Sequence, residues 1–378
     1  MSHKVQLQSF HDGHGHLTEF AGFSLPLWFK GITPESLAVR NAAGLFDVSH
    51  MGRAVVTGVD SERFLQFITT NDVTALTDGL GQYSLLCTPN GRIKDDVFVL
   101  RLQKDRYLIV YNAANRTKDF QWFIANSGGF KIRVEDVSNQ TAQFAVQGPK
   151  AAALVTTLAE GSRPADLPRF GCIEGEIGRS RVLLSRTGYT GEDGFEILVW
   201  DSPFQDANHA QAVWEKLLEA GKPFGLELCG LGARDLLRLE AGLCLYGTDI
   251  DEKTNPFEAK LGFVVKLDKN CIGKDKLLEA KQNGPERLRV GLVMQSRVIP
   301  RHEFDIATHG VEIGRVTSGT LSPIVNAGIA MGYVEQESAK QGTLVEVRIR
   351  DRWEPARVTK MPFYDTTKYG YSRKSPQI

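Results

Sequence analysis

Apolar residues recur at the spacing of an amphipathic helix in several stretches of the first 283 residues. From 207 to 220 they fall three or four positions apart, and Gly221 follows as a stop signal. A second helix is expected from 233 to about 243. A short third one is expected over 34–40, where Thr33 is in position to cap the first turn. These segments predict helices that pack one face against a core.

Strand-forming patterns occupy much of the remaining chain, and their character changes near residue 284. The runs 93–101 and 107–111 alternate or cluster β-forming residues, and Asn90-Gly91 is a strong hairpin-turn signal just before the first run. The two runs are expected to be neighbouring strands. Beyond 284, β-forming runs separated by turn residues predict a separate, mainly β domain. These runs are 290–293, 311–316, 344–349 and 356–361.

The chain length sets the number of domains. With 378 residues, the chain exceeds the usual size of one hydrophobic core, so two or three domains are expected. We predict an α+β protein, with two α+β domains in 1–283, whose internal boundary the sequence does not place, and the mainly β domain in 284–378.

Composition narrows the class of protein. Lys+Arg and Asp+Glu both number 45, so no net field draws the chain to nucleic acid or to an anionic membrane, and neither partner is expected. No apolar run is long enough to cross a bilayer, and the first ten residues lack the features of a signal or transit peptide. The five cysteines are widely spaced and lie mostly among apolar residues, which favours buried free thiols in a reducing cytoplasm.

Asp95 and Asp96 are adjacent carboxylates on a predicted strand and must point to opposite faces, so they cannot form one shared-proton dyad. We expect Asp96 to face inward with Phe98 and Leu100, and Asp95 to face outward. A carboxylate on an otherwise apolar face needs a polar partner or a ligand. Asp96 is therefore a candidate for proton handling or for orienting an amine, and an aspartate held by backbone donors is an equal alternative.

The histidines of the segment 11–16 are spaced closely enough to bind a transition metal. They lie among glycines, with no thiol or carboxylate partner fixed by a regular element. We therefore favour a solvated loop or a stretch resembling a purification-tag remnant, and we predict no metal.

The segment 185–197 is rich in glycine and leads into a short alternating strand, which describes a tight loop directed toward a bound molecule. It lacks the Gly-Lys-Ser/Thr of a phosphate-binding loop. Tyr189 would suit stacking, and Glu196 would suit a guanidine-like edge such as that of an amino-pterin. A plain hairpin loop is the alternative.

Arg234 and Arg238 are four residues apart and share one face of the predicted helix. Because the neighbouring positions are strongly apolar, at least one of the two should be half-buried. A half-buried arginine needs a carboxylate partner, which the protein or a substrate would supply.

Taken in order along the chain, these and other short motifs closely resemble the T-protein family, the aminomethyltransferases of the glycine cleavage system. No single motif is specific, but their order from Leu45 to Pro323 is very hard to reach by chance. The matching segments are 45–52, 70–72, 95–96, 112–115, 147–149, 188–196, 232–235, 247–252, 255–256, 316–319 and 322–323.

The resemblance implies a three-domain, cloverleaf-like arrangement around a central folate channel, with a C-terminal β-barrel. It also implies the reaction, in which the aminomethyl group on the lipoyl arm of the H-protein passes to tetrahydrofolate. The products are ammonia, 5,10-methylenetetrahydrofolate and the dihydrolipoyl H-protein. Tetrahydrofolate is thus the expected co-substrate, and lipoylated H-protein the expected transient partner.

Residue by residue, the resemblance implies that Asp96 is the key aspartate beside the folate nitrogen that attacks. The other positions that match folate-contacting residues are Tyr83, Asn112, Tyr189, Glu196 and Arg234, and the region near Tyr369 would close the site. Some relatives carry aromatic residues at positions 98, 100 and 243. The alignment across 167–171 is loose, so no role is assigned there.

Two other readings remain open at this point. A folate-dependent demethylase acting on a small methylated sulfur or nitrogen compound would use the same channel without a lipoyl protein. A non-catalytic folate-binding factor, such as those that assist iron–sulfur cluster assembly, would share the fold. The intact 188–194 loop favours the aminomethyltransferase, and no cysteine-centred signature supports the binding factor.

Overall fold

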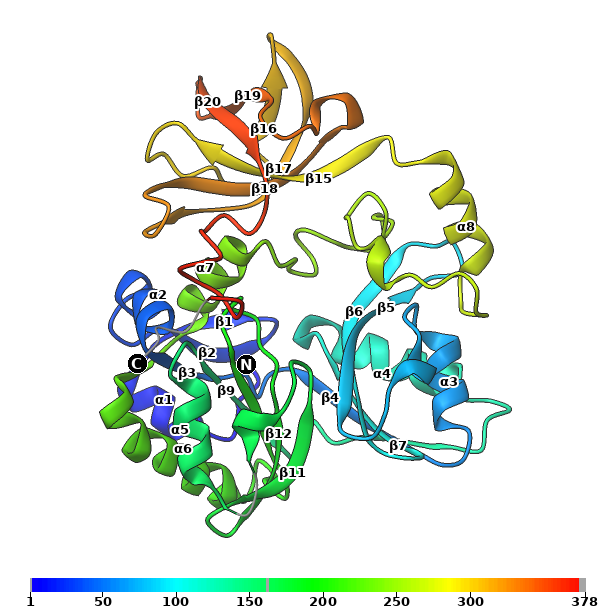
Figure 1. Cartoon of the computed structure of the whole chain (residues 1–378), viewed down its shortest axis with the longest axis vertical. Coiled ribbons are helices and arrows are strands. Elements are labelled where there is room, and N and C mark those ends of the chain that lie inside the picture. Colours follow the sequence, from blue (N-terminus) through cyan, green and yellow to red (C-terminus); the bar gives the residue numbers. More distant parts are fainter. Residues whose placement is uncertain (1, 161–162, 374–378) are drawn as a thin grey trace.

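The computed structural model describes residues 2–160 and 163–373, which form three units (Figure 1). One unit is built on a seven-stranded sheet, the second on a five-stranded sheet, and the third is a closed barrel. The barrel lies at the top of the view, above the other two, which stand side by side. The prediction of an α+β fold in three domains with a β-barrel toward the C-terminus is confirmed.

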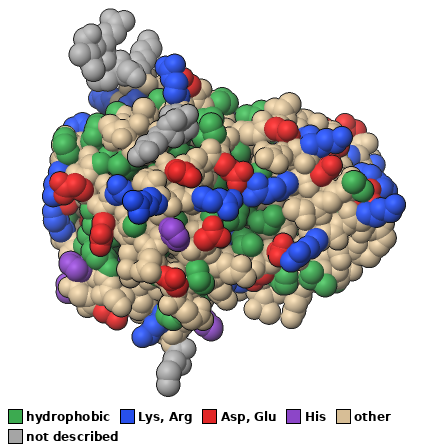
Figure 2. Space-filling model, turned by 90° about the horizontal axis from the view of Figure 1, so that it is seen from below, with side chains coloured by type: hydrophobic (Ala, Val, Ile, Leu, Met, Phe, Trp, Pro, Cys, Tyr) green, Lys and Arg blue, Asp and Glu red, His purple; other side chains and the backbone are tan. Residues whose placement is uncertain are grey.

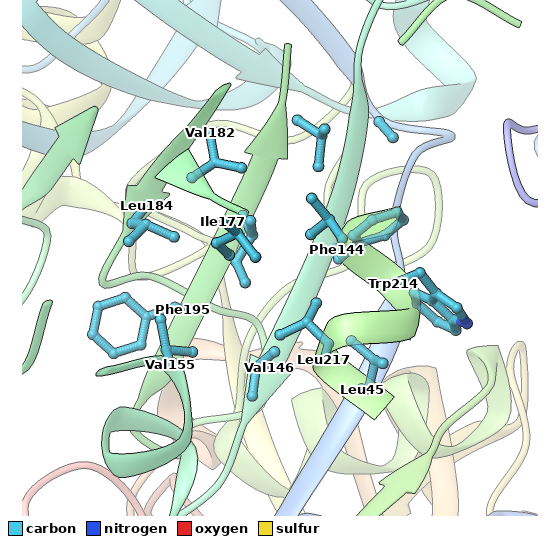
Figure 3. Packing of buried hydrophobic residues seen from close by; sticks show 14 of the residues in the cluster. Leu45, Phe144, Val146, Val155, Ile177, Val182, Leu184, Phe195, Trp214 and Leu217 are labelled. Atoms are coloured by element: carbon cyan, nitrogen blue, oxygen red, sulfur yellow. The ribbon is translucent and has the colours of Figure 1, made fainter. Parts of the chain in front are cut away.

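The first unit contains a sheet with the strand order β10-β11-β12-β13-β9-β3-β14. Apolar side chains of this sheet pack against two helices, and the cluster includes Leu45, Phe144, Phe195 and Trp214 (Figure 3). The strands are β3 (Ala43–Asp47), β9 (Ala142–Gln147), β10 (Ala159–Glu160), β11 (Cys172–Ile177), β12 (Ser180–Ser185), β13 (Gly194–Val199) and β14 (Leu226–Leu228). The two helices are α5 (Ala151–Leu158) and α6 (Asn208–Gly221), and α1 (Gln8–His14), α2 (Ile32–Asn41), α7 (Leu231–Ala241) and the hairpin of β1 (His16–Phe20) and β2 (Phe23–Trp28) complete the unit.

The second unit interrupts the first along the chain. Its sheet has the order β5-β6-β7-β4-β8, and β5 and β6 are joined by the predicted turn at Asn90-Gly91. Gly91 has a φ of +70°, a conformation that glycine adopts without strain. The elements are β4 (Gly52–Thr57), α3 (Ser61–Ile68), β5 (Leu80–Cys87), β6 (Ile93–Gln103), β7 (Arg106–Tyr111), α4 (Arg116–Ala125) and β8 (Arg133–Asp136).

The third unit follows α8 (Lys274–Asn283) and is a closed barrel with the order β15-β18-β17-β16-β19-β20. Closure leaves no strand edge unpaired, and the interior is filled by aliphatic side chains such as Leu292, Val316 and Val347. The strands are β15 (Arg287–Met294), β16 (Asp305–Thr308), β17 (Val311–Ser322), β18 (Ala327–Glu335), β19 (Leu344–Ile349) and β20 (Arg352–Thr359).

The sheets of the first two units pack against each other through an apolar layer. Period-2 alternation gives each strand two apolar faces, one for its own core and one for this layer. Leu100 and Leu108 come from the second unit, and Leu183, Leu198 and Trp200 from the first. This contact fixes the two sheets relative to each other and therefore positions any side chain at its margin.

The start of α2 corrects one prediction. Thr33 does not cap the helix, because it lies inside it, and the residue at the N-cap is Gly31. The backbone N–H groups of Phe29, Lys30 and Gly31 instead donate to Oε1 of Glu35, at 2.6, 2.8 and 3.0 Å. A carboxylate from within the helix thus satisfies backbone donors of the segment that leads into the helix, including the N–H of the N-cap residue Gly31.

Charged groups of both signs are interspersed over the face seen in Figure 2, with no large field of one sign. This distribution agrees with the equal numbers of acidic and basic residues. None of the helices in the described part of the chain combines the length and the apolar character that crossing a bilayer requires.

Candidate functional site

A cavity of about 170 Å³ opens where the apolar layer between the two sheets ends. Its wall draws on the second unit through β5, β6 and the segment after β7, and on the first unit through the 187–189 loop, β13 and α7. Six of the seven predicted site residues line it, namely Tyr83, Asp96, Asn112, Tyr189, Glu196 and Arg234.

Asp96 faces this cavity from β6, as predicted, beside Phe98. Its carboxylate accepts hydrogen bonds from the Tyr83 hydroxyl at 3.0 Å and from Asn112 Nδ2 at 2.8 Å. The pKa of Asp96 is raised to about 7, first by burial and then by the negative charge of Asp95, against the lowering effect of the two hydrogen bonds. Asp96 is therefore poised to exchange a proton near neutral pH.

Asp95 does not face outward, and the prediction for it was wrong. Its side chain is fully buried on the face of β6 that carries Val97 and Val99. Both of its oxygens are engaged, by the backbone N–H of Asn112 at 3.1 Å and by the side-chain amides of Asn112 at 2.9 Å and Asn115 at 2.7 Å. The prediction that Asp95 and Asp96 lie on opposite faces of β6 was correct. Asp95 is nevertheless buried, because other residues cover both faces of this strand.

Glu196 projects into the cavity because Phe195 and Ile197, its neighbours on β13, point into the core of the first unit. One carboxylate oxygen accepts a hydrogen bond from the Thr187 hydroxyl at 2.7 Å. The described residues give the other oxygen no hydrogen-bond donor, so it is available to a ligand.

Tyr189 and Arg234 form a stacked pair on the wall, with the guanidinium carbon 4.6 Å from the ring centroid. The Tyr189 hydroxyl donates to the carbonyl of Cys244, which holds the ring in place. Burial lowers the pKa of Arg234, while Glu196 and Tyr189 raise it. No carboxylate among the described residues lies within ion-pair distance of Arg234, so its donors are directed toward the cavity or solvent.

Arg238, one helical turn further on, is the buried arginine of the predicted pair. Its guanidinium contacts Asp249 at 2.5 Å, Ser318 at 2.8 Å and the exposed Asp235 at 2.8 Å. The protein thus supplies the carboxylate partner for Arg238, whereas no carboxylate of the described residues pairs with Arg234. The expectation of at least one buried arginine is met.

Tyr369 is the one predicted site residue that the structure does not bring to the cavity. Its ring packs edge-on against Tyr364 and below the guanidinium of Arg373. The same C-terminal stretch contacts the 186–193 loop, since Gly370 N–H donates to Glu192 at 3.0 Å and Tyr371 N–H to the carbonyl of Gly191 at 3.0 Å. It therefore supports the loop behind the cavity.

Sequence reasoning missed several wall residues. His50 lies within a matching motif but received no role, and burial followed by the charge of Arg234 lowers its pKa to about 3, so it is a neutral imidazole. Phe170 packs against Phe98 with ring centroids 5.2 Å apart, in a stretch where the alignment was too loose to assign. No local pattern marks Phe170, because its partner is 72 positions away.

The histidine-rich segment is not a loop or a tag-like remnant, although His14 and His16 are exposed to solvent as expected. Residues 8–14 form α1, and His11 is fully buried. Its Nε2 lies 2.8 Å from Oδ2 of Asp47, a carboxylate that the sequence alone could not place there. Within the described residues no cluster of three or more His, Cys, Asp or Glu side chains has metal-binding geometry. All five cysteines are buried and unpaired with one another, as predicted.

Comparison with known proteins places the chain in a family. Residues 7–269 match the model of the GCVT N-terminal domain, and residues 287–365 match that of the glycine cleavage T-protein C-terminal barrel domain. The chain belongs to the glycine cleavage T-protein family. Together the two matches cover both sheet-containing units, the barrel, and every residue that lines the cavity.

Relatives within the T-protein family extend over nearly the whole chain. The aminomethyltransferase of Bacillus subtilis is 43% identical over 352 residues, covering 93% of this chain and 95% of the relative. The probable aminomethyltransferase of Pyrococcus horikoshii is 40% identical and covers 99% and 100%. The crystal structure of glycine cleavage system aminomethyltransferase T from Bartonella henselae superimposes with a TM-score of 0.90 at 35% identity, covering 98% and 99%.

Membership in the T-protein family makes the chain an enzyme, an aminomethyltransferase. The two other readings of the sequence, a demethylase and a non-catalytic folate-binding factor, are not favoured by these relatives.

Proposed function

We propose that the cavity binds the pterin ring of tetrahydrofolate and that Asp96 is the catalytic residue of the transfer. The full reaction proposed is that of the family resemblance: the aminomethyl group leaves the lipoyl arm of an H-protein, and ammonia and 5,10-methylenetetrahydrofolate are released. The observation that carries the proposal is one carboxylate, with a pKa near neutrality, in a small cavity with Glu196, Arg234 and Tyr189.

The residues present fit such a ligand. The volume of about 170 Å³ is below the roughly 300–1,000 Å³ of pockets that enclose a whole drug-sized ligand, so it suits one ring system with the rest of the molecule extending outward. The unused oxygen of Glu196 would accept hydrogen bonds from the amino edge of the pterin. The faces of Tyr189 and Phe98 would cover the ring, and Arg234 would meet a negatively charged or carbonyl group.

Reduced folate supplies a nucleophilic nitrogen when it is bound. The protein's part is to hold that nitrogen near the carboxylate of Asp96, which Tyr83 and Asn112 fix from two sides. Positioning of the reactants can account for roughly 7–11 kcal/mol of a barrier. In its ionised form Asp96 would orient and polarise the nitrogen and stabilise developing positive charge.

A lipoylated H-protein is the proposed transient partner, since the reaction delivers its substrate on a lipoyl arm. The cytoplasm is the proposed compartment, because five buried thiols without disulfides suit a reducing environment.

The test is the variant Asp96→Asn, which keeps the size and shape of the side chain but removes its charge and replaces one acceptor oxygen with an NH2 donor. Aminomethyl transfer, assayed with lipoylated H-protein and tetrahydrofolate, should slow by about 10²–10⁴-fold, the range for a positioned acid or base. Folate affinity, measured by calorimetry, should change little. Asp105→Asn is the matched control, because Asp105 lies in the β6–β7 turn at a positive φ that asparagine accepts. Near-normal turnover in Asp96→Asn would reject the role of Asp96.

A further inference from the structure

Asp119 is a buried carboxyl group behind the catalytic aspartate that the proposed mechanism does not use. It lies on α4 and has no exposed surface. Neither of its oxygens receives a hydrogen bond from a nitrogen or hydroxyl donor in the described chain. Among the described residues, the carboxyl group of Asp95, which is equally buried, lies in side-chain contact with it. A charged, unsolvated carboxylate in this position would be very costly.

Asp95, in contrast, is surrounded by donors. It accepts three N–H hydrogen bonds, two from Asn112 and one from Asn115, at 2.7–3.1 Å. These donors stabilise the ionised form of Asp95. Two carboxyl groups in hydrogen-bond contact cannot both be ionised in a dry core, so the proton belongs on the one without donors.

The nearest positive charges do not remove this constraint. Lys118 Nζ is engaged by the carbonyl of Lys94 at 2.6 Å, by the Tyr246 hydroxyl at 3.0 Å and by Glu252 at 3.1 Å. Lys94 lies over the ring of Trp122 and within 3.6 Å of Glu252. Burial, followed by the hydrogen bond and the charge of Asp95, raises the pKa of Asp119, against a smaller lowering effect of the two lysines.

Asn112 connects this pair to the cavity. Its Nδ2 lies 2.9 Å from Oδ1 of Asp95 and 2.8 Å from Oδ1 of Asp96, so a single amide group bridges the two carboxylates. The amide of Asn112 fixes the orientation of the Asp96 carboxylate, provided that Asp95 fixes the amide. The order of contacts from the core outward is Asp119, Asp95, Asn112 and Asp96.

We propose that Asp119 is a positioning residue that stays protonated at neutral pH, donates a hydrogen bond to Asp95, and through Asn112 fixes the carboxylate of Asp96. Its effect on turnover rests on the proposed function of Asp96, whereas its protonation does not. No group is transferred in this arrangement: the proton of Asp119 stays on Asp119, and only the geometry is passed on. The role needs a neutral hydrogen-bond donor at position 119, not a carboxylate.

Infrared spectroscopy tests the proton directly on the protein without ligand. The Asp96→Asn variant removes the contribution of Asp96, and a carbonyl band of a protonated carboxylic acid should persist in it at neutral pH. The difference spectrum between Asp96→Asn and the double variant Asp96→Asn/Asp119→Asn should show the loss of that band. A difference spectrum without such a loss overturns the proposal, whatever the enzyme's activity proves to be.

Kinetics tests the positioning role. Asp119→Asn keeps a neutral donor to Asp95 and should retain kcat within about threefold, since an amide N–H replaces the acid O–H. Asp119→Leu, of similar size, has no donor, and kcat should fall by about 10- to 100-fold, because a misplacement of about 1 Å can cost 10²-fold. The KM for tetrahydrofolate should stay unchanged in both.

Equal losses in the two variants, or a wild-type kcat in Asp119→Leu, would overturn the positioning role. If Asp119→Leu does not fold, Asp119→Asn and the difference spectrum decide the question. If the wild-type protein transfers no aminomethyl group at all, the proposed function fails, and the infrared result still decides whether Asp119 holds a proton.

Discussion

At the residue scale, the site depends on two adjacent carboxylates of β6, Asp95 and Asp96, which have different surroundings. The alternation along β6 sends Asp96 to the cavity and Asp95 into the core of the second unit. The alternation of the sequence shows that adjacent strand residues face opposite ways. It places Asp96 on the same face as Phe98 and Leu100. It does not show that Asn112 and Asn115 will cover Asp95, since those partners come from a different element.

The raised pKa of Asp96 makes a prediction about stability. The pKa of Asp96 is higher in the folded state than its ordinary value of 3.8, so the folded protein binds more protons. The stabilisation from this proton is fully present at low pH and is lost as the pH rises through about 7. The variant Asp96→Asn lacks this group, so it does not lose this stability as the pH rises. Compared with the wild type, the variant should gain stability as the pH rises from about 4 to about 7, by up to a few kcal/mol at about 1.4 kcal/mol per pKa unit.

Chemical denaturation of both proteins at several pH values measures this difference. Because all other groups are shared, the difference reports the titration of Asp96 together with that of Asp95, whose charge acts on it. A constant difference across this pH range would show that the carboxyl group titrates normally.

Glu196 makes a second prediction at this scale, for ligand affinity. If its unused oxygen holds the pterin, Glu196→Ala should weaken tetrahydrofolate binding by about 1.5–3 kcal/mol, the range for a hydrogen bond to a charged group. Calorimetric titration measures the change. Glu176→Ala, on the exposed side of β11, is the control and should bind normally. An unchanged Kd in Glu196→Ala would assign Glu196 a structural role.

At the element scale, α7 links the cavity to the barrel. The helix was predicted from its apolar spacing, but the different partners of its two arginines were not. Arg234 lies over Tyr189 at the cavity, and Arg238 crosses to Asp249 and to Ser318 of β17. The partners of Arg238 are 11 and 80 positions away, so no local pattern identifies them.

Removing one partner of this ion pair should be costly. Asp249→Ala would leave the buried guanidinium of Arg238 without its buried carboxylate and with only the exposed Asp235, and the free energy of unfolding should fall by about 3–5 kcal/mol. Asp235→Ala is a matched control, because Asp235 contacts the same guanidinium from an exposed position and should cost about 1 kcal/mol or less. Equal losses in both variants would contradict the importance given to burial.

The β-forming runs beyond residue 284 were also sufficient to predict strands, and closure into a barrel followed from the family resemblance. The domain boundary that we predicted at residue 284 stays a prediction. It falls between the end of α8 at Asn283 and the start of β15 at Arg287.

At the scale of the whole molecule, the cavity exists because two sheets dock. Composition and periodicity predicted that several units would form and that one would be mainly β. They could not predict which faces would meet, because Leu100 and Leu198 look like ordinary core residues in their own strands. The same limit explains the absence of Tyr369 from the cavity, since its place depends on where the C-terminal stretch docks.

A ligand that bridges the two sheets should stabilise both units together. Tetrahydrofolate at about 100 times its Kd should raise the free energy of unfolding by about 2.7 kcal/mol. Hydrogen exchange should slow in β6 of the second unit and in β13 of the first. Protection confined to one unit would show that the ligand does not contact both walls, and Glu196→Ala at the same folate concentration provides the comparison.

The cavity wall extends along the chain from Phe20 to Tyr246. During synthesis, therefore, a growing polypeptide has no complete cavity until about two thirds of it has left the ribosome, although the Asp96 strand emerges much earlier. Nascent chains arrested before Tyr246 would carry the acidic group without its opposite wall, so a ligand of this cavity, such as the reduced folate proposed above, would assist folding only late in translation.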